Sequence, residues 1–355
     1  MAHLHLFNPE HDIVLASGCR SKMNGIPKAA LRLRRDLGFL PAFWASDGDY
    51  VLVDDVAVAK AAAAPWADYL PEVCFLSAGS LRDLLADAPD SLIPSPWGWD
   101  ADVRARLAEA GMATSLMPDD EALSRLRQMS SRAATVGLLS ETVSAVGVAV
   151  GERQVARSMA EVLRLTGCRP SSVVKSPWSS SGRGVRFVGR TLSESEEGFV
   201  RHCIEQQGCV VVEPCYERVL DFALEYEVHR SAEPSFVGLS VFENSGTGYV
   251  GGMLASEDDK WALLRSHFPD DVWRRTESSL VRWLGSLSCY DGPAGVDMML
   301  VRTSEGLRLH PVVEVNLRRT MGHAAIAVYA RTHGRFSRMR IGYDRGSYQL
   351  LLTSI

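Results

Sequence analysis

Two polar side chains, Glu314 and Asn316, lie in a stretch over residues 313–318 that alternates like a β-strand. Residues two apart in a strand point to the same face, so a carboxylate and an amide oxygen lie side by side. Asp297 begins another apolar run, and a turn over residues 303–306 joins the two. If they pair as a hairpin, Asp297 reaches the same spot. Three oxygen ligands suit a hard cation such as Mg²⁺; the alternative is an exposed hairpin whose polar residues face water.

A second group of candidate residues follows a short apolar strand over residues 172–175, which ends in Lys175. A stretch rich in serine and glycine follows this strand, and we call residues 179–184 the Ser/Gly loop. Small residues let the backbone approach an anion closely, and free N–H groups and hydroxyls bind phosphate oxygens. No Gly-Lys-Ser/Thr follows, so this is not a Walker loop, and an ordinary turn is the alternative. Because a lysine directly precedes it, the loop is predicted to bind phosphate through Ser179, Ser180, Ser181, Gly182, Arg183 and Gly184.

Acidic residues mark two further strands. The run over residues 209–216 is apolar up to Glu213, and the proline that follows ends the ladder because it has no N–H. The freed backbone and the carboxylate could hydrogen-bond the edge of an adenine. In the next strand, residues 220–229, Glu225 and Glu227 share one face. That face is predicted either to meet solvent or to hold an amine or sugar hydroxyls.

The N-terminal stretch also carries ionisable residues, which directly follow a predicted strand. Residues 2–7 alternate and predict a strand, and the polar cluster that starts at Asn8 follows directly. Open α/β sheets bind ligands at the carboxyl ends of their strands. Glu10, His11 and Asp12 are therefore candidates for substrate contact. The alternative is that Asn8 and Asp12 only cap turns or a helix.

Taken in chain order, these features resemble the ATP-grasp superfamily, as seen in D-alanine–D-alanine ligase and biotin carboxylase. The order is the capped basic residue Ser131-Arg132, the strand lysine with its Ser/Gly loop, Glu213-Pro214, the acidic strand, Asp297, and Glu314-x-Asn316-x-Arg318. The resemblance covers residues 120–345. It implies an α/β (α+β) fold in which two subdomains, 119–211 and 212–355, clamp ATP and are preceded in the chain by a small Rossmann-like domain, 1–118.

The resemblance also implies a role for each group. Lys175 would bind the α- and β-phosphates, the Ser/Gly loop would close over the β- and γ-phosphates, and Arg318 would steady the γ-phosphate or an acyl-phosphate. Arg132 stands where the family usually has a lysine; arginine keeps the charge and adds a bidentate fork. The remaining implied ligands are Glu213, Pro214, Cys215 and Tyr216 for adenine, Glu225 or Glu227 for the ribose or adenine edge, and Asp297, Glu314 and Asn316 for Mg²⁺ or Mn²⁺.

The leading hypothesis is an ATP-dependent carboxylate–amine ligase. A carboxylate substrate becomes an acyl-phosphate, and an amine, or less often a thiol, displaces the phosphate. The protein supplies positioning and charge stabilisation, so no side-chain nucleophile is needed. A small-molecule kinase with the same fold is the nearest alternative. A non-catalytic ATP-binding protein is another, which the complete set of metal ligands argues against.

The elements that must position these residues follow from periodicity and caps. Ser131 is expected to cap a helix that begins at Arg132, and alternating strands and helices through residue 115 predict a small α/β domain. The Pro/Trp-rich stretch 93–100 is expected to be a loop. A strand is expected over residues 50–54, and helices over 28–37, 56–64, 80–86, 100–110, 121–129 and 151–166.

Bulk properties set the remaining expectations. A chain of 355 residues is expected to form two or three domains. The net charge of −5 and the lack of a basic block argue against a nucleic-acid partner. No signal peptide or transmembrane run is recognised, and the seven scattered cysteines predict reduced thiols. We therefore expect a cytoplasmic enzyme with small-molecule partners, and a homodimer on general grounds.

Overall fold

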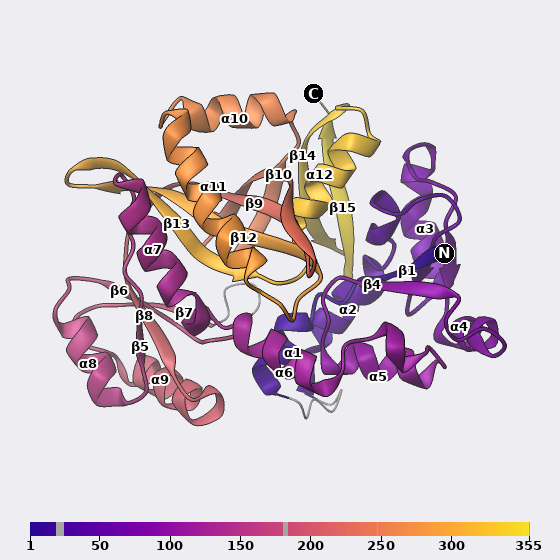
Figure 1. Cartoon of the computed structure of the whole chain (residues 1–355), viewed down its shortest axis with the longest axis horizontal. Helices are drawn as coiled ribbons and strands as arrows, with labels where there is room; N and C mark the ends of the chain where they lie inside the picture. The colour runs from indigo at the N-terminus through magenta and orange to yellow at the C-terminus, as the bar shows by residue number, and fades with distance from the viewer. Residues whose placement is uncertain (19–24, 180–183, 247, 355) are drawn as a thin grey trace. The chain divides into compact units, whose positions relative to one another are not determined.

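The computed structural model describes residues 1–18, 25–179, 184–246 and 248–354. The chain forms two compact units, whose helices and strands are labelled in Figure 1. Unit 1 comprises Met1–Arg125, Gly251–Ser256 and Arg318–Ile355, and unit 2 comprises Leu126–Val250 and Glu257–Leu317. The division into three domains at residues 118 and 211 stays a prediction. No helix in the described residues is long and apolar enough to cross a membrane.

Unit 1 is built on a four-stranded parallel sheet. Its strands are β1 (Ala2–Leu6), β2 (Tyr50–Leu52), β3 (Cys74–Leu76) and β4 (Leu92–Pro96). They are ordered β3-β2-β1-β4, so the chain winds outward from β1 to β3 and then returns to β4 beside β1. In open α/β sheets, such a reversal leaves a ligand crevice outside the carboxyl ends of the two strands that flank it. Here those strands are β1 and β4. The strands predicted near residues 2–7 and 50–54 are confirmed.

The strand β4 corrects one expectation, because it lies where the Pro/Trp-rich loop was predicted. Pro94 pairs with Leu4 of β1, and Pro96 pairs with Leu6. Proline has no N–H to donate, but β4 is an edge strand of this sheet and pairs on one side only. The two prolines are therefore compatible with strand pairing, although prolines in this stretch had indicated a loop.

The two faces of the parallel sheet bury alternate residues. Leu4 and Leu6 belong to a core that includes Leu81 and Leu107, from the helices α4 (Ala78–Leu85) and α5 (Ala101–Glu109). Residues of the opposite parity, such as Val51, belong to a second core with the C-terminal segment of the chain. That segment comprises α12 (Met321–Arg331), β14 (Phe336–Asp344) and β15 (Ser347–Ser354), with β14 pairing the end of β11 (Gly248–Met253). Apolar burial thus explains why the last residues fold with the first ones.

Capped short helices complete unit 1. Asp55, Ser77 and Asp100 each accept a backbone N–H at the start of a helix. The helices predicted near residues 28–37, 56–64, 80–86 and 100–110 are confirmed within two residues. Besides α4, α5 and α12, the helical segments are α1 (His11–Ser17), α2 (Lys28–Asp36), η2 (Leu40–Phe43), α3 (Val56–Ala63), η3 (Ala64–Tyr69) and η4 (Thr114–Leu116), and α6 (Asp120–Met129) leads into unit 2.

Unit 2 contains two antiparallel arrays. The smaller sheet has the order β5-β8-β6-β7, and the strands of the larger array that belong to this unit run β13-β12-β9-β10. The smaller sheet's strands are β5 (Gln154–Ala156), β6 (Ser172–Lys175), β7 (Val185–Val188) and β8 (Val210–Pro214). The larger array has β9 (Glu217–His229), β10 (Ala232–Ser245), β12 (Gly292–Thr303) and β13 (Gly306–Asn316). The helical segments are η5 (Arg132–Thr135), α7 (Val136–Val146), α8 (Met159–Gly167), α9 (Glu194–Gln207), α10 (Glu257–Arg265) and α11 (Asp270–Gly285).

The single helix predicted over residues 151–166 is wrong, because the structure has β5 followed by α8. Ser158 explains the break. Its backbone is extended and its side chain accepts the N–H of Glu161 at 3.3 Å, so the helix begins only after it. The residues before Ser158 pair with β8 instead. The predicted hairpin of β12 and β13 is confirmed, with Thr303 opposite Gly306 at its turn.

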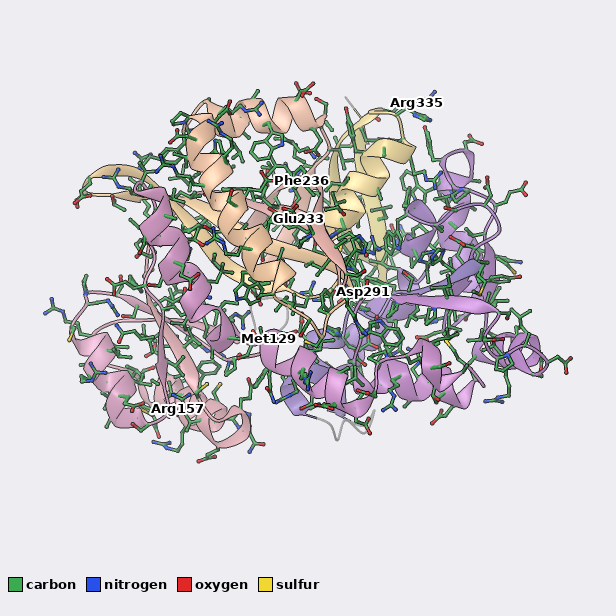
Figure 2. The ribbon with its side chains drawn as sticks, viewed as in Figure 1. Met129, Arg157, Glu233, Phe236, Asp291 and Arg335 are labelled. Carbon is green, nitrogen blue, oxygen red and sulfur yellow. The ribbon has the colours of Figure 1, made fainter. Side chains whose placement is uncertain are left out.

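The larger array of unit 2 has one face covered by helices. Figure 1 shows both helices beside this array, where α11 contacts β9 and β10 and α10 contacts β10. Phe222 of β9 meets Trp273 of α11 edge to face, with ring centroids 5.9 Å apart. Phe236 of β10, labelled in Figure 2, lies 6.1 Å from the ring of Trp261 in α10. Because side chains alternate along strands, the residues between these aromatics point to the opposite face.

Candidate functional site

The opposite face of this array carries the predicted metal ligands. Asp297 of β12 lies directly across from Glu314 of β13, and Gly295 lies across from Asn316. Directly paired residues in antiparallel strands share a face. Register with β9 places Glu225 opposite Gly295 on this same face. The fold therefore brings Asp297, Glu314, Asn316 and Glu225 onto one polar surface, to which Glu227 also belongs by alternation.

The donor set on this surface fits a hard divalent cation, because two carboxylates and one amide all offer oxygen atoms. Glu314 is partly exposed, whereas Asn316 is 8% exposed. No group of three or more histidine, cysteine, aspartate or glutamate side chains in the described parts of the chain could hold a metal ion. The predicted metal ligands are two acidic side chains and one amide, so they do not form a group of this kind. Asp297, Glu314 and Asn316 remain our candidates for Mg²⁺ or Mn²⁺.

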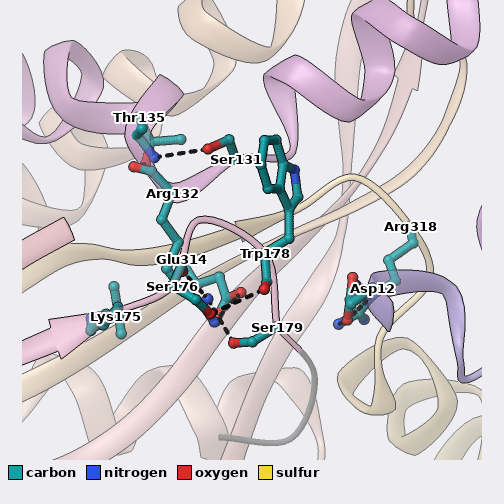
Figure 3. A network of polar contacts seen from close by, with 12 residues as sticks. Asp12, Ser131, Arg132, Thr135, Lys175, Ser176, Trp178, Ser179, Glu314 and Arg318 are labelled. Carbon is teal, nitrogen blue, oxygen red and sulfur yellow. Dashed lines mark hydrogen bonds and ion pairs between the residues drawn. The ribbon is translucent and has the colours of Figure 1, made fainter. Parts of the chain in front are cut away.

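Arg132 ties this surface to the start of the Ser/Gly loop. Its Nη2 lies 2.8 Å from Oε1 of Glu314, and its Nη1 donates to Oγ of Ser179 and to the carbonyl of Ser176, both at 2.8 Å (Figure 3). The arginine is 5% exposed and begins η5, whose cap is Ser131. One buried guanidinium thus spans two of the predicted ligand-binding segments.

The Ser/Gly loop is held closed at its base. The N–H of Ser176 donates to the carbonyl of Gly184 at 2.8 Å. A Cβ at Gly184 would lie 2.0 Å from Oγ of Ser176 and 2.4 Å from Cβ of Ser179, so a larger residue would not fit without movement. The candidates Ser180, Ser181, Gly182 and Arg183 lie outside the described residues. Phosphate binding by this loop stays a prediction.

A buried ion-pair network surrounds the strand lysine. Nζ of Lys175 lies 2.6 Å from Oε2 of Glu213, and Nε of Arg153 lies 2.5 Å from Oε1 of the same carboxylate. Arg153 also donates to the carbonyls of Val312 and Val313 at 3.0 and 2.8 Å. These bonds link β13 to the smaller sheet. Lys175 and Glu213 are 8% and 2% exposed, so the pair is largely shielded from water.

The charges in this network shift one another. Burial alone would raise the pKa of Glu213, but Arg153 and Lys175 outweigh it and lower that pKa to about 2. Burial lowers the pKa of Lys175, while Glu213 opposes the shift. Glu213 is therefore ionised at neutral pH, and it supplies a fixed negative charge against which the lysine is positioned.

His310 is a buried neighbour of this network that the sequence did not single out. It is fully buried, and neither ring nitrogen has a hydrogen-bond partner among the described residues. Tyr216, one of the predicted adenine contacts, meets the His310 ring edge to face at 5.6 Å. Burial lowers the pKa of His310 to about 3, so the imidazole is neutral at pH 7. Burial raises the pKa of Tyr216 to about 12.

The adenine candidates after β8 lie at the end of the smaller sheet. Pro214 pairs with Ser172, and the N–H of Cys215 donates to the carbonyl of Ser171 at 3.4 Å. Tyr216 follows and reaches His310. Both oxygens of Glu213 already contact cations, yet a carboxylate oxygen accepts more than one hydrogen bond. Adenine binding by these residues stays a prediction.

In unit 1, the polar residues after β1 meet the residues after β4. Nδ2 of Asn8 donates to the carbonyl of Gly98 at 2.9 Å and to Oδ2 of Asp100 at 3.0 Å, and Oδ1 of Asn8 accepts the N–H of Gly98 at 3.2 Å. Nδ1 of His11 lies 3.1 Å from Oδ2 of Asp100. Asn8 thus braces the loop after β4, and Asp100 fixes the ring of His11. The alternative had expected Asn8 and Asp12 to cap turns or a helix, but no side chain of the described residues caps the start of α1.

Arg318 lies in unit 1, although it follows Asn316 by two residues in the chain. Its Nε lies 3.1 Å from both carboxylate oxygens of Asp12, and its Nη2 lies 2.7 Å from Oδ2 (Figure 3). The next residue, Arg319, donates its N–H to the carbonyl of Trp97 at 2.7 Å. Asp12 and Arg318, predicted separately as a substrate contact and a phosphate contact, are therefore direct partners.

Three residues at these sites escaped the sequence interpretation. Arg153 was hidden inside a wrongly predicted helix; a lone arginine just before an apolar strand was the available signal. Asp100 was interpreted only as the start of a helix, and nothing local indicated that it faces His11. His310 lies in an alternating strand and gave no distinguishing signal.

No protein-family model and no curated protein sequence matches the chain. Among solved structures, it is similar to N5-carboxyaminoimidazole synthetase from Staphylococcus aureus complexed with ADP, with 12% identity, 99% of this chain and 80% of that chain covered, and a TM-score of 0.47. It is also similar to a putative ATP-grasp superfamily protein from Archaeoglobus fulgidus, with 12% identity, full coverage of both chains and a TM-score of 0.48. A third similar structure is D-alanyl-alanine synthetase A from Vibrio cholerae, with 14% identity, 69% and 72% coverage and a TM-score of 0.41.

Proposed function

We propose that this protein is an ATP-dependent carboxylate–amine ligase that works through an acyl-phosphate. The observation that carries the proposal lies within unit 2. Asp297, Glu314 and Asn316 share one sheet face, and Arg132 connects Glu314 to Ser179 at the start of the Ser/Gly loop. An oxygen-rich face joined by a guanidinium to a loop of small residues suits a nucleotide triphosphate bound with a divalent cation.

Each group of residues in the chain would have its own role in binding ATP. Lys175, held by Glu213, would place a positive charge on the α- and β-phosphates, and the loop from Ser179 to Gly184 would enclose the β- and γ-phosphates. Pro214, Cys215 and Tyr216 would contact the adenine beside Glu213, and Glu225 or Glu227 the ribose or adenine edge. Arg318 would stabilise charge on the reacting phosphoryl group. Fixed charges of this kind act through positioning and electrostatic stabilisation.

Asp297, Glu314 and Asn316 would hold Mg²⁺ or Mn²⁺. When bound, the cation neutralises charge on the β- and γ-phosphates as the γ-phosphoryl group is transferred. The guanidinium of Arg132, which contacts Glu314 and Ser179, would also donate to phosphate oxygens.

The partners of such an enzyme are a small-molecule carboxylate and an amine or, less often, a thiol. We expect the enzyme to act in the cytoplasm and to form a homodimer; size-exclusion chromatography with light scattering tests the latter.

One assay tests the proposed function. ATP and MgCl₂ are incubated with the protein and defined pools of amino acids and small carboxylic acids, and products are followed by mass spectrometry together with phosphate release. ADP, phosphate and a condensed product support the ligase. A phosphorylated metabolite without condensation contradicts it and indicates a kinase. Binding of ATP without turnover in any pool indicates a nucleotide-binding protein instead.

A further inference from the structure

We propose that Arg153 is a positioning residue of the nucleotide site in unit 2. Its one guanidinium sets the direction of the predicted metal ligand Glu314 and, through Glu213, the position of the predicted phosphate ligand Lys175. The proposal rests on the proposed function and adds a residue to it. All four residues belong to unit 2, and Arg153 acts through the groups that it holds, not by touching the cation or the phosphates.

The strand that carries Glu314 is irregular directly before this residue. Asp297 of β12 pairs with Glu314. The next pair toward the turn joins Met299 to His310, so three residues of β13, 311–313, lie opposite one residue of β12. This is a β-bulge, and a bulge bends its strand and re-aims the side chains beside it. The direction of Glu314 therefore depends on how the bulge is held.

Arg153 holds this bulge by its carbonyl groups. Nη2 of the arginine donates to the carbonyl of Val312 at 3.0 Å and to that of Val313 at 2.8 Å. Val313 directly precedes Glu314, so the bound carbonyl belongs to the peptide group that leads into the metal candidate. The side chain of Arg153 is 0% exposed, so water does not compete for these carbonyls.

The other nitrogens of the same guanidinium are also bound. Nε lies 2.5 Å from Oε1 of Glu213, whose Oε2 lies 2.6 Å from Nζ of Lys175. Nη1 donates to Oγ1 of Thr135. Because a carboxylate is planar, holding one of its oxygens limits where the other can lie. Arg153 therefore determines where Lys175 finds its counter-charge.

The segment that leads to Arg153 is itself tied to β13. The N–H of Val150 donates to the carbonyl of Leu309 at 2.8 Å. Gly151 follows with a φ of 151°, and a Cβ there would lie 2.8 Å from Cδ1 of Leu139. Only glycine fits both the backbone conformation and the space. The backbone thus runs close to β13 and brings Arg153 to the bulge.

A lysine at position 153 could not make these contacts together. The guanidinium is planar and presents donors from three nitrogens, whereas an ammonium presents all its donors from one. Arg153→Lys would keep a positive charge beside Glu213 but could not also hold Val312 and Val313. We therefore expect Arg153→Lys to disturb the metal candidates and the phosphate lysine together.

The alternative is that Arg153 only stabilises the fold. Its replacement would then lower the free energy of unfolding, but the protein that remains folded would bind its ligands as before. Arg331 of unit 1 offers a matched control, because its guanidinium also bonds two backbone carbonyls, those of Phe43 and Ala45. Arg331→Lys is expected to lower the urea unfolding midpoint without changing nucleotide binding.

ADP titrations of the full-length protein, by calorimetry, test both branches without turnover. The affinity in EDTA reports the phosphate lysine, and the gain in affinity when MnCl₂ replaces EDTA reports the metal candidates. The complex that ADP and Mn²⁺ form in solution is the same for every variant, so it cancels in the comparison. In Arg153→Lys we expect the affinity in EDTA to fall, by no more than in Lys175→Ala. We expect the Mn²⁺ gain to shrink by about 10-fold or more, as when a group that orients a metal ligand is lost.

A double-mutant cycle tests whether Arg153 acts through Lys175. In EDTA, Lys175→Ala is expected to weaken ADP binding less in the Arg153→Lys background than in the wild type. Additive effects would show that the two residues act independently, and would overturn this branch of the proposal.

Thr135→Val provides a second variant if Arg153→Lys does not fold. It removes the hydroxyl that accepts Nη1 of Arg153 and leaves both charge pairs of Glu213 in place. We expect both ADP readouts to change in the same direction as in Arg153→Lys, to a smaller degree. Thr135→Ser keeps the hydroxyl and is expected to restore wild-type values. Wild-type binding by a folded Thr135→Val variant would count against the positioning role.

The outcomes separate this proposal from the ligase function. Weaker ADP binding and a smaller Mn²⁺ gain in Arg153→Lys, without ligase turnover by the wild type in any substrate pool, would support the positioning role and contradict the ligase. Ligase turnover by the wild type, with both ADP readouts unchanged in a folded Arg153→Lys variant, would leave the ligase standing and overturn the positioning role. A change in only one readout would reject the coupling of the two groups.

Discussion

Arg132 and Glu314 form an ion pair with Nη2 and Oε1 2.8 Å apart, and the same guanidinium also binds the start of the Ser/Gly loop. A lysine ammonium is compact and could not reach Glu314, Ser179 and the carbonyl of Ser176 with the same planar geometry. Arginine at this position therefore makes contacts that a lysine could not make together. One residue thus holds a predicted metal ligand and a predicted phosphate ligand together.

Arg132→Lys is expected to keep the charge but lose this bridge. Losing a charged hydrogen bond is worth about 1.5–3 kcal/mol, so we expect MgADP to bind roughly 10- to 100-fold more weakly. Isothermal titration calorimetry measures the change. Arg157→Lys, at the exposed arginine labelled in Figure 2, serves as the control. Equal affinity of wild type and Arg132→Lys would show that the bridge has no role in nucleotide binding.

Glu314→Gln is expected to abolish metal-dependent turnover while the protein stays folded. The amide retains one oxygen but loses the charge that a divalent cation needs. We expect a fall of at least about 100-fold, comparable to removing a charge-stabilising group from other active sites. Phosphate release across a MgCl₂ titration measures it. The exposed Glu233, also labelled in Figure 2, provides the matched control Glu233→Gln. Full activity of Glu314→Gln would reject the metal assignment.

Lys175→Ala is expected to weaken ATP binding by about 10-fold or more, because a charged partner of the phosphates is lost. It also leaves Glu213 with Arg153 as its remaining cation contact among the described residues, at 2.5 Å. Removing one partner of a buried pair is destabilising, so the melting temperature should fall modestly. ADP titration and thermal unfolding separate the two effects. The exposed Lys60 supplies the control Lys60→Ala, and unaltered ADP affinity in Lys175→Ala would refute the assigned role.

His310→Phe is expected to make folding stability less sensitive to acid. Burial lowers the folded-state pKa of His310 to about 3, against an ordinary 6.5, so below pH 6.5 the unfolded chain takes up a proton that the folded chain does not. The contribution of His310 to the free energy of unfolding of the wild type is therefore fully present above pH 6.5, and it is lost as the pH falls toward 3.

Urea unfolding midpoints at pH 7.5 and pH 5 test this prediction, since Glu213, with a pKa of about 2, remains ionised in the folded chain over that range. The midpoint of His310→Phe should drop less between the two pH values than that of the wild type. His202→Phe on the exposed face of α9 is the control. An identical pH response of wild type and His310→Phe would show that His310 is not the source.

The sequence determined the local structure that carries most of the candidate residues. Alternation predicted the hairpin of β12 and β13, and it placed Glu314 and Asn316 on one face because the side-chain period of a strand is two. Capping chemistry located most of the short helices for the same local reason. The prediction of a loop near Pro94 was wrong, because the effect of a proline depends on whether its strand is central or at an edge, which is a property of the whole sheet.

Only the tertiary structure decided which of these residues are partners. Nothing in the sequence pairs Lys175 with Glu213, Glu213 with Arg153, or His11 with Asp100, because these contacts join segments far apart in the chain. Arg318 shows the limit most clearly. Its spacing from Glu314 made it a phosphate contact by resemblance, whereas the fold carries the chain beyond Leu317 into unit 1 and pairs its guanidinium with Asp12. Sequence spacing determines the face of a strand, but burial and long-range packing determine the partner of a charge.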